Sequence, residues 1–484
     1  MKPLKKITAL FLALTLSFCL SSCFIVINDP DETNPAAPEE TSSPFLPIET
    51  VEHRDVVGET LDPAVAEVRK TLSSISSGEH ESLPITVTCV TGAKLFAPGE
   101  DNSTFSRAVD TRNKLLKEYA GTDIIVQERT YEEMLSEART AKNAGQYYTD
   151  VVCIPLNELG SLLGQRMLMN LKTLYDTDFD KDWFDVYSTD QLAAGSFSYG
   201  IVGDAILPYD SVYCVYFNKD MTALYPDLYD IVDRGEWTFD KMYEYIREVV
   251  SREEGVFGLG YGTDNTVFSN ICFNATGLGY VTTSFGNTPV LNDDSDKVDE
   301  FVGLIKKLLV TEDSTHIQGT AEEARQAFLD GKLLFYIDKL SESEDLTNNF
   351  GILPVPKYFA DGDYTTYVDE FAPVIVVLNS NNTLERTGEF LQFVNASTGK
   401  LLRDGYVRDA VDNVVRDIRS ADMIEIILDN TRYEFPTVFG VRYPAVANAT
   451  YNAVSQAIFG NADYSTIRSR AAANFNAEMR RSFS

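Results

Sequence analysis

Histidine and cysteine are scarce in this sequence of 484 residues, which has three His and six Cys. No CxxC or HExxH pair occurs, so no zinc site is indicated. His53 and His80 lie at the edge of the core-forming sequence, and His316 stands alone, so we expect a surface residue at 316 rather than a metal ligand. No Ser-His-Asp, Cys-His or phosphate-loop pattern occurs either, which leaves nucleophilic and phosphate-binding chemistry without support.

Basic residues are also few, with 41 Lys and Arg against 73 Asp and Glu, for a formal net charge of -32. A nucleic-acid partner is not expected, because binding phosphates requires a basic footprint. Anionic lipid is not expected as a partner either, because like charges repel. The simplest interpretation is an acidic surface in an extracytoplasmic medium.

Long hydrophobic runs are missing as well. The apolar run 7–20 follows three lysines and is too short to span a bilayer comfortably. Residues 1–22 therefore predict a secretory signal peptide. The run Leu20-Ser21-Ser22-Cys23 resembles the lipobox of bacterial lipoproteins. The resemblance implies that Cys23 carries lipid, with acyl chains such as palmitate, and becomes the first residue of the mature chain. The alternative is an ordinary signal peptide with an incidental cysteine.

The segment after Cys23 differs in composition from the rest. Residues 28–47 are rich in Pro, Ser, Thr and acidic side chains, which cannot bury enough apolar surface to fold. We predict a tether over 23–82 that holds a globular body away from the membrane. Residues 59–78 could form a short helix, whose docking the sequence leaves open.

Four cysteines remain after the signal region: Cys89, Cys153, Cys214 and Cys272. Three of them lie in apolar, strand-like runs, where a free thiol acts as a small core hydrophobe. An exported protein can form disulfides, but this spacing has no framework pattern, so we expect free thiols and leave the disulfide state open.

Strand-like and helix-like segments alternate from residue 84 onward. Apolar strands are expected at 83–90, 123–127 and 150–154, and the intervening segments have helical periodicity. This alternation predicts α/β units on a parallel sheet covered on both faces. The roughly 400 residues of the body suffice for two domains.

The second half repeats this style. Thr238 is a candidate cap for a helix, and further helices are expected at 296–310 and 384–395. Strands are expected at 332–337 and 373–378, and the C-terminus is mostly helical. No short-period repeat occurs.

Several weak motifs follow one another in a specific order. They are Tyr-Cys-Val-Tyr-Phe-Asn-Lys-Asp at 213–220, Gly-Glu-Trp-Thr-Phe-Asp at 235–240, Ala-Arg-Gln-Ala-Phe-Leu-Asp-Gly-Lys-Leu-Leu-Phe-Tyr-Ile at 324–337, and Phe-Gly-Ile-Leu-Pro-Val-Pro at 350–356. The last leads to a strand at 374–379 and a helix with Phe-Leu-Gln-Phe-Val at 390–394. This order resembles the extracellular solute-binding proteins of ABC importers, in the cluster related to maltodextrin-binding proteins. The resemblance covers roughly residues 84–484.

The resemblance implies a two-lobe, periplasmic-binding-protein-like α/β fold of type II, with a hinge that the chain crosses three times. Carried over, the first lobe is 84–210 with 338–396, and the second lobe is 211–337 with 397–484. A ligand then binds in the cleft between the lobes, and closure about the hinge buries it.

Candidate ligand-binding residues follow from this arrangement, because strand ends and hinge segments face the cleft. They are Thr91, Gly92, Asn157, Tyr209, Asp210, Ser211, Thr263, Asp264, Asn265, Asp338, Glu370 and Tyr443. Aromatic faces and planar acceptors are the groups that sugars prefer. Each acid has an alternative role as a helix cap and each Tyr as packing. Trp237 and Trp183 are expected to pack rather than to bind.

The sequence thus predicts a monomeric protein on the outer face of the cytoplasmic membrane, without a cofactor or catalytic activity. It would capture a small solute, a sugar or oligosaccharide by resemblance, and deliver it to the transmembrane subunits of an ABC permease. One alternative is a ligand-sensing lipoprotein that presents its closed form to a membrane receptor. Another is a lipid-anchored glycosidase, but Asp369 and Glu370 are adjacent and would point to opposite faces of a strand.

Overall fold

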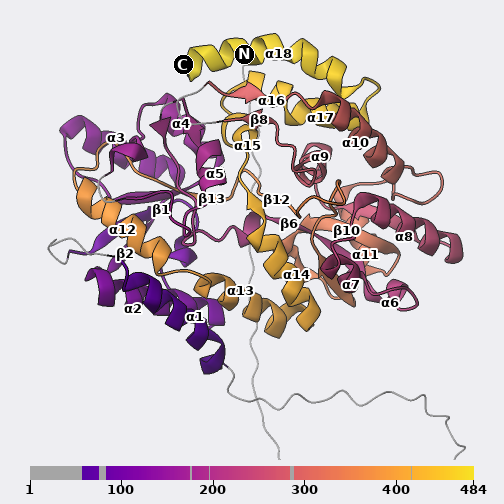
Figure 1. The fold of residues 1–484 in the computed structure, drawn as a ribbon, viewed down its shortest axis with the longest axis horizontal. Helices are drawn as coiled ribbons and strands as arrows, with labels where there is room; N and C mark the ends of the chain where they lie inside the picture. The colour runs from indigo at the N-terminus through magenta and orange to yellow at the C-terminus, as the bar shows by residue number, and fades with distance from the viewer. Residues whose placement is uncertain are drawn as a thin grey trace, which may run out of the picture. The chain divides into compact units, whose positions relative to one another are not determined.

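The computed structural model describes residues 57–75, 83–174, 177–195, 197–283, 288–415 and 417–483 (Figure 1). Residues 55–484 form one compact unit. The predicted signal peptide, Cys23 and the first part of the predicted tether lie outside the described residues. Within the described part, no helix has both the length and the apolar character that a membrane span requires.

The first lobe is built on a sheet with strand order β13-β3-β1-β2. β1 (Ile85–Cys89) pairs in parallel with β2 (Ile124–Glu128) and β3 (Val151–Pro155), as the alternating pattern predicts. β13 (Pro373–Val376) joins antiparallel to β3. The sheet is therefore mixed rather than parallel, because β13 arrives from a remote part of the chain instead of through a βα crossover.

Helices flank this sheet and begin where the sequence supplies caps. Ser103 caps α2 (Thr104–Ala120), and Thr130 forms a capping box with Glu133 at the start of α3 (Tyr131–Ala144). The other helices of the lobe are α4 (Asn157–Gly164), α5 (Val186–Gln191), α12 (Leu384–Ala396) and α13 (Leu401–Ala410).

The range predicted as a tether contains a docked helix. α1 (Val57–Leu72) packs against α2, α12 and α13, with Val68 and Leu72 buried against the first-lobe core. Burying each such side chain stabilises the folded state by about 1.5–3 kcal/mol. The folded body thus begins at α1 rather than at β1.

The second lobe is built on a sheet with strand order β11-β6-β10-β7. β6 (Tyr213–Asn218) pairs antiparallel with β10 (Leu333–Lys339), which pairs in parallel with β7 (Phe257–Tyr261). β11 (Phe350–Leu353) pairs antiparallel with β6, so residues 350–353 lie in the second lobe and not in the first, where the predicted 338–396 segment placed them. Gly351 permits this edge pairing, because a Cβ there would collide with the ring of Phe217.

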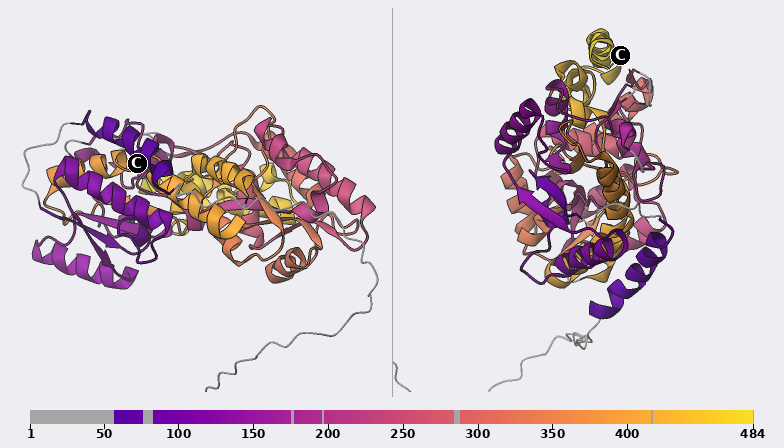
Figure 2. Two further views of the ribbon diagram at one scale, coloured as in Figure 1. Left: turned by 90° about the horizontal axis from the view of Figure 1, so that it is seen from below. Right: turned by 90° about the vertical axis from the view of Figure 1, so that its left-hand side faces the viewer.

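The helices of the second lobe surround its sheet (Figure 2). They are α6 (Lys219–Thr222), α7 (Leu228–Asp233), α8 (Phe239–Arg252), α9 (Asn265–Asn274), α10 (Ser295–Leu308), α11 (Ala321–Leu329) and α14 (Ile418–Asp429). Thr238 caps α8 as predicted, by accepting a hydrogen bond from the Lys241 N–H. Trp237 is fully buried and donates its indole N–H to the Pro354 carbonyl, which confirms its packing role.

The C-terminal helices are α15 (Phe435–Phe439), α16 (Pro444–Ala449), α17 (Tyr451–Phe459) and α18 (Tyr464–Ser482). α17 packs on α9 and α18 on α10, both in the second lobe. α15 packs on α4, and α13 packs on α2, both in the first lobe. Residues 397–484 are therefore shared between the lobes, and not confined to the second.

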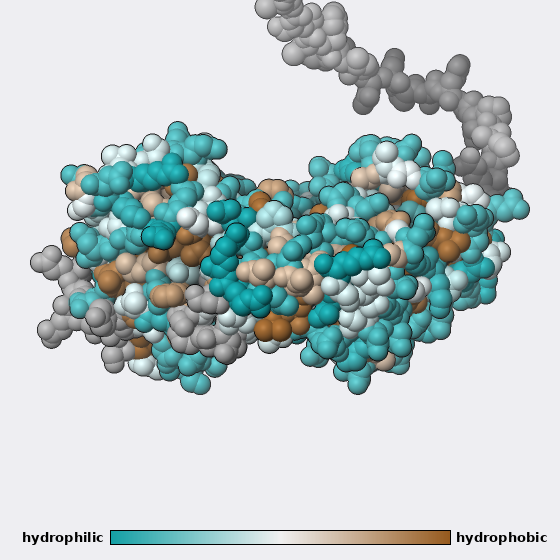
Figure 3. Space-filling model, turned by 90° about the horizontal axis from the view of Figure 1, so that it is seen from above, coloured by the Kyte–Doolittle hydropathy of each residue, from teal (hydrophilic) through white to brown (hydrophobic). Residues whose placement is uncertain are grey.

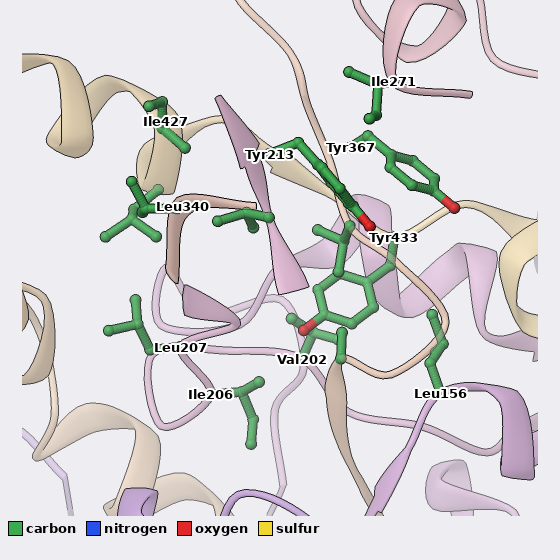
Figure 4. Close-up of a cluster of buried hydrophobic side chains, with 14 of the residues drawn as sticks. Leu156, Val202, Ile206, Leu207, Tyr213, Ile271, Leu340, Tyr367, Ile427 and Tyr433 are labelled. Atoms are coloured by element: carbon green, nitrogen blue, oxygen red, sulfur yellow. The ribbon is translucent and has the colours of Figure 1, made fainter. Parts of the chain in front are cut away.

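The chain crosses between the lobes near Tyr209–Ser211, 368–372 and Val411–Val415, and it passes between them again on either side of α15. The second crossing was predicted between 337 and 338, but it comes later because β11 still belongs to the second lobe. The third was predicted between 396 and 397, but it comes later because α13 still belongs to the first lobe. At this hinge the short strands β12 (Thr366–Tyr367) and β14 (Thr431–Arg432) pair in parallel. A buried cluster that includes Tyr213, Tyr367 and Tyr433 fills the space beside them (Figure 4).

Candidate functional site

A cavity of about 830 Å³ lies beside the hinge, where the ends of β7 and β10 face the second crossing and the C-terminal helices. Its walls combine acidic, basic and aromatic side chains. The lining residues are Tyr213, Gly262, Thr263, Asp264, Thr266, Val267, Asn270, Ala321, Glu322, Arg325, Tyr336, Asp338, Lys339, Glu342, Asp345, Tyr367, Asp369, Glu370, Phe371, Pro436, Thr437, Val441 and Tyr451.

Asp338 lies in the cavity wall at the end of β10 and is 7% exposed. Its Oδ2 accepts a 2.6 Å hydrogen bond from the Tyr336 hydroxyl, and its Oδ1 accepts one of 2.8 Å from the Lys339 N–H. Burial raises the pKa of the Asp338 carboxyl, and these two hydrogen bonds oppose that shift. Asp338 is thus a fixed acceptor rather than a mobile surface acid.

Gly262 makes room for this carboxyl from the neighbouring strand end. A Cβ at Gly262 would collide with Asp338 Oδ2 and with the Tyr336 hydroxyl oxygen. Both colliding atoms belong to a buried hydrogen bond, so neither can give way cheaply. The close approach of the chain after β7 to Asp338 therefore requires glycine.

Asp369 lies opposite, in the second crossing, and is 4% exposed. Its Oδ2 lies 2.7 Å from Lys339 Nζ and 3.3 Å from the Tyr213 hydroxyl oxygen, while its Oδ1 accepts a hydrogen bond from the Phe371 N–H. The Lys339 ammonium also lies 6.0 Å from the centre of the Tyr213 ring and 5.6 Å from that of Phe371. This ion pair joins β10 to the crossing segment.

Glu370 and Asp264 add two more carboxylates. Glu370 is half-buried, and burial, followed by the neighbouring charges of Asp369 and Asp264, raises the pKa of its carboxyl. In the described part of the chain, its carboxylate makes no hydrogen bond or ion pair. Asp264 caps α9, since its Oδ1 accepts hydrogen bonds from the N–H groups of Thr266 and Val267.

Aromatic rings complete the walls. Tyr213 and Tyr367 stack with ring centres 5.8 Å apart and planes inclined by 30°. Tyr451 lies near Glu370, whose charge contributes after burial to raising the pKa of the Tyr451 hydroxyl to about 12. Phe371 is 55% exposed at the cavity. Rings beside fixed acceptors suit a ligand with apolar faces and many donors.

Four predicted residues line this cavity: Thr263, Asp264, Asp338 and Glu370. Asn265 lines a neighbouring, more open pocket, where its Oδ1 accepts a hydrogen bond from the Tyr261 hydroxyl. Thr263, Asp264 and Asn265 were selected because they follow a strand, Asp338 because it ends a strand at a predicted crossing, and Glu370 because it precedes a predicted crossing.

Two further predicted residues support the cavity from behind. The Asn157 N–H donates to the Glu370 carbonyl, and the Ser211 carbonyl accepts from the Asp369 N–H, both at 2.9 Å. They hold the crossing segment by its backbone and do not line the cavity.

The remaining predicted residues lie elsewhere. Tyr209 stacks on Tyr406, and Tyr443 packs against Phe483. Gly92 has a positive φ of 69° and lies close to Cys153 and Pro373. Thr91 and Asp210 do not line the cavity. For both tyrosines the packing alternative holds, because their rings contact other aromatic side chains and do not line the cavity.

Sequence reasoning did not select several lining residues. They are Tyr213, Arg325, Lys339, Tyr367, Asp369, Phe371 and Tyr451. Strand alternation predicted opposite faces for Asp369 and Glu370. Asp369 lies in the crossing segment, outside the named strands, so alternation does not apply there and both residues line the cavity. Lys339, the last residue of β10, adjoins the selected Asp338, but no sequence signal singled it out.

The scarce side chains take structural roles. Cys89, Cys153, Cys214 and Cys272 are free and buried, which confirms the expectation of free thiols. His316 is partly rather than fully exposed; it stacks on Tyr261, and burial lowers the pKa of its imidazole to about 4. Trp183 is partly buried and donates to Gln392. The described ranges contain no group of three or more His, Cys, Asp or Glu that could hold a metal ion.

A family model described as bacterial extracellular solute-binding protein matches residues 111–400. No curated protein matches the chain. Two solved structures superpose with a TM-score of 0.51 and 14% identity, each over 84% of this chain and 99% of the other. One is the galacto-N-biose/lacto-N-biose I-binding protein of the ABC transporter from Bifidobacterium longum, in complex with lacto-N-biose. The other is a cyclo/maltodextrin-binding protein complexed with maltotetraose. These likenesses concern the two-lobe fold.

Proposed function

The chain belongs to the bacterial extracellular solute-binding proteins, and from this we propose that it captures a carbohydrate for an ABC importer. Solute binding and an extracytoplasmic location follow from the family. The carbohydrate, and its delivery to permease subunits, are the proposed part. The two similar structures, whose printed ligands are lacto-N-biose and maltotetraose, support that choice through their fold.

The make-up of the cavity wall carries the proposal. Fixed acceptors such as Asp338 alternate with the rings of Tyr213, Tyr367 and Tyr451. A sugar presents hydroxyl donors at its edge and C–H groups on its faces, which match acceptors and rings respectively. The volume of about 830 Å³ lies within the range of about 300–1,000 Å³ that is typical of small-molecule sites.

The position of the cavity explains how capture can be signalled. The Asp338 side of the wall belongs to the second lobe, whereas Glu370 and Phe371 lie on the crossing to the first lobe. A ligand that contacts both sides favours the arrangement in which they approach, so binding shifts the open–closed equilibrium. We propose that the permease senses the closed form.

The proposed anchor fits this role. Lipid on Cys23 would keep the protein at the membrane and raise its effective concentration beside the permease. Hydrophilic residues predominate on the face of the body shown in Figure 3, as expected for a protein in an aqueous medium.

A panel of neutral and charged oligosaccharides, screened by thermal shift and followed by calorimetry, tests the proposal. We expect at least one to raise the melting temperature, because a ligand bound to the native state stabilises it. Asp338→Asn should weaken that binding about tenfold or more, since it removes a charged acceptor from the wall. Asp361→Asn is the matched control, because Asp361 is exposed and outside the lining. No shift across the panel, or equal losses in both variants, would contradict the proposal.

We infer binding without turnover. The family consists of binding proteins, and Asp369 already holds the Lys339 ammonium. Incubation of the protein with each bound glycan, followed by chromatography, should return the glycan intact. Release of a shorter saccharide would establish a glycosidase instead.

A further inference from the structure

We propose that the captured carbohydrate carries a positive charge, as an amino sugar or an oligosaccharide with free amino groups. This inference rests on the proposed function and specifies its ligand. Its basis is the charge balance of the cavity wall, together with the way in which the wall already holds one ammonium group.

Carboxylates outnumber cations on this wall. Seven acidic residues line the cavity: Asp264, Glu322, Asp338, Glu342, Asp345, Asp369 and Glu370. Arg325 and Lys339 are the cations among the described lining residues, and each is already engaged. Lys339 pairs with Asp369 at 2.7 Å, and Arg325 Nε lies 3.8 Å from Glu342. The other five lining acids form no ion pair with a basic side chain within the described ranges.

The contacts of Lys339 show how the cavity wall binds an ammonium group. Its Nζ contacts Asp369 Oδ2 and lies near the faces of Tyr213 and Phe371. One carboxylate with two rings is an arrangement that recognises an ammonium through charge and through cation–π attraction. The wall thus already binds one ammonium group through the same kinds of contact that we propose for the ligand.

Glu370 is a second carboxylate that could bind an ammonium group, and no protein cation forms an ion pair with it in the described ranges. Its carboxylate has no hydrogen bond or ion pair within the described ranges. The charges that act on it are those of Asp369 and Asp264, which Lys339 opposes less strongly, and Tyr451 lies near. Two like charges act on it, and they raise the pKa of its carboxyl together with burial. A ligand ammonium beside Glu370 would relieve this repulsion, whereas a neutral sugar would bury the charge further without compensating it.

Other ligand classes fit less well. An anion would meet a concentration of negative charge, which a cavity with low-dielectric walls intensifies. A bare metal ion is not supported, because no suitable cluster of ligands occurs in the described part of the chain. An ammonium on a sugar needs a single carboxylate beside a ring, and Glu370 beside Tyr451 provides one that no protein cation pairs with in the described ranges.

The test compares oligosaccharides whose amino groups are either charged or neutralised by acetylation, and the salt dependence of the affinities separates the effect of charge from that of the acetyl group. Glucosamine and galactosamine oligomers are each paired with the fully N-acetylated oligomer of the same linkage and length. Affinities are measured by calorimetry on the full mature chain, at a pH where the amino groups are protonated and at two salt concentrations. We expect at least one charged member to bind about tenfold or more tightly than its neutral partner, with a preference that shrinks at high salt.

Variants locate the effect. Glu370→Gln should reduce the preference for the charged member, while Asp361→Asn, on an exposed side chain outside the lining, should leave it intact. Unchanged melting temperatures of both free variants would show that they fold. Equal affinity for charged and neutral members overturns this inference but leaves the proposed function standing. Failure of every amino oligosaccharide to bind overturns the inference, and failure of every carbohydrate overturns the proposed function as well.

Discussion

Lys339 Nζ lies 2.7 Å from Asp369 Oδ2 and joins the last residue of β10 to the segment that leads into the first lobe. The two residues are neighbours in space at the point where the lobes meet, although thirty positions of chain separate them. This ion pair is part of the cavity wall and also links the second lobe to the crossing segment at the hinge. Its loss should therefore affect stability as well as binding.

Lys339→Met is expected to destabilise the protein by about 3 kcal/mol, because Asp369 would remain buried without its cation. Urea unfolding of the wild type and the variant measures the difference. Lys117→Met provides a matched control, since the Lys117–Asp123 pair lies on the surface with both side chains more than half exposed. That control should change stability by less than about 1 kcal/mol. Equal effects would show that the buried pair has no special role.

Gly262→Ala is expected to weaken ligand binding about tenfold or more. The added Cβ would push Asp338 and Tyr336 out of their hydrogen bond, and Asp338 would no longer be held in the wall. Calorimetry with the carbohydrate found by the screen measures the loss. Gly303→Ala is the control, because a Cβ at that position in α10 meets nothing within 4 Å. Retained affinity in Gly262→Ala would remove Asp338 from the binding wall.

Stability should fall as pH rises from about 4.5 to about 6, because of Glu434. This carboxyl is buried beside the Tyr187 hydroxyl, which donates to its Oε1 at 2.7 Å. Burial raises the pKa of Glu434 from its ordinary 4.5 to about 6, so the folded state holds the proton more tightly than the unfolded chain does. The stability that protonation provides below pH 4.5 is lost as pH rises through 6, and it amounts to about 2 kcal/mol.

Glu434→Gln should remove this component, because an amide still accepts the Tyr187 hydrogen bond but does not ionise. Chemical denaturation at a series of pH values compares the two proteins. Glu236→Gln, on an exposed side chain, should keep the wild-type profile. A wild-type profile in Glu434→Gln would assign the pH dependence to other groups.

Cys23→Ser is expected to release the protein from the membrane fraction of expressing cells. Several acyl chains together give stable anchoring, and serine cannot be acylated through a thiol. Fractionation with immunoblotting follows the protein, and palmitate labelling follows the modification. Persistence of the serine variant in the membrane fraction would point to another means of attachment.

Local signals in the sequence predicted much of the fold. α2, α3 and α8 begin at Ser or Thr caps that the sequence shows, β3 is apolar throughout, and β1 alternates apolar residues with threonine. β11 was assigned to the wrong lobe, because the motif at 350–356 identifies a strand without identifying its partner. Only pairing with β6, more than a hundred residues away in sequence, decides its position.

The site was less predictable for the same reason. Asp338 was located because a strand end is visible in the sequence, whereas the ring of Tyr451 reaches the cavity from a helix that folds back from the C-terminus. Tyr209 and Tyr443 have the same chemistry as Tyr213 and Tyr451, and packing alone separates the two pairs. Residue type therefore indicated the kind of site, and tertiary contacts selected its members.

The pairing of β13 with β3 also limits when the protein can fold. β3 ends at Pro155 and β13 begins at Pro373, so the first sheet lacks an edge strand until most of the chain is available. Such distant pairing makes folding slow, since a large loop must close before the contact forms. The lobes cannot mature one after the other from the N-terminus, and a chain truncated before β13 should yield no finished lobe.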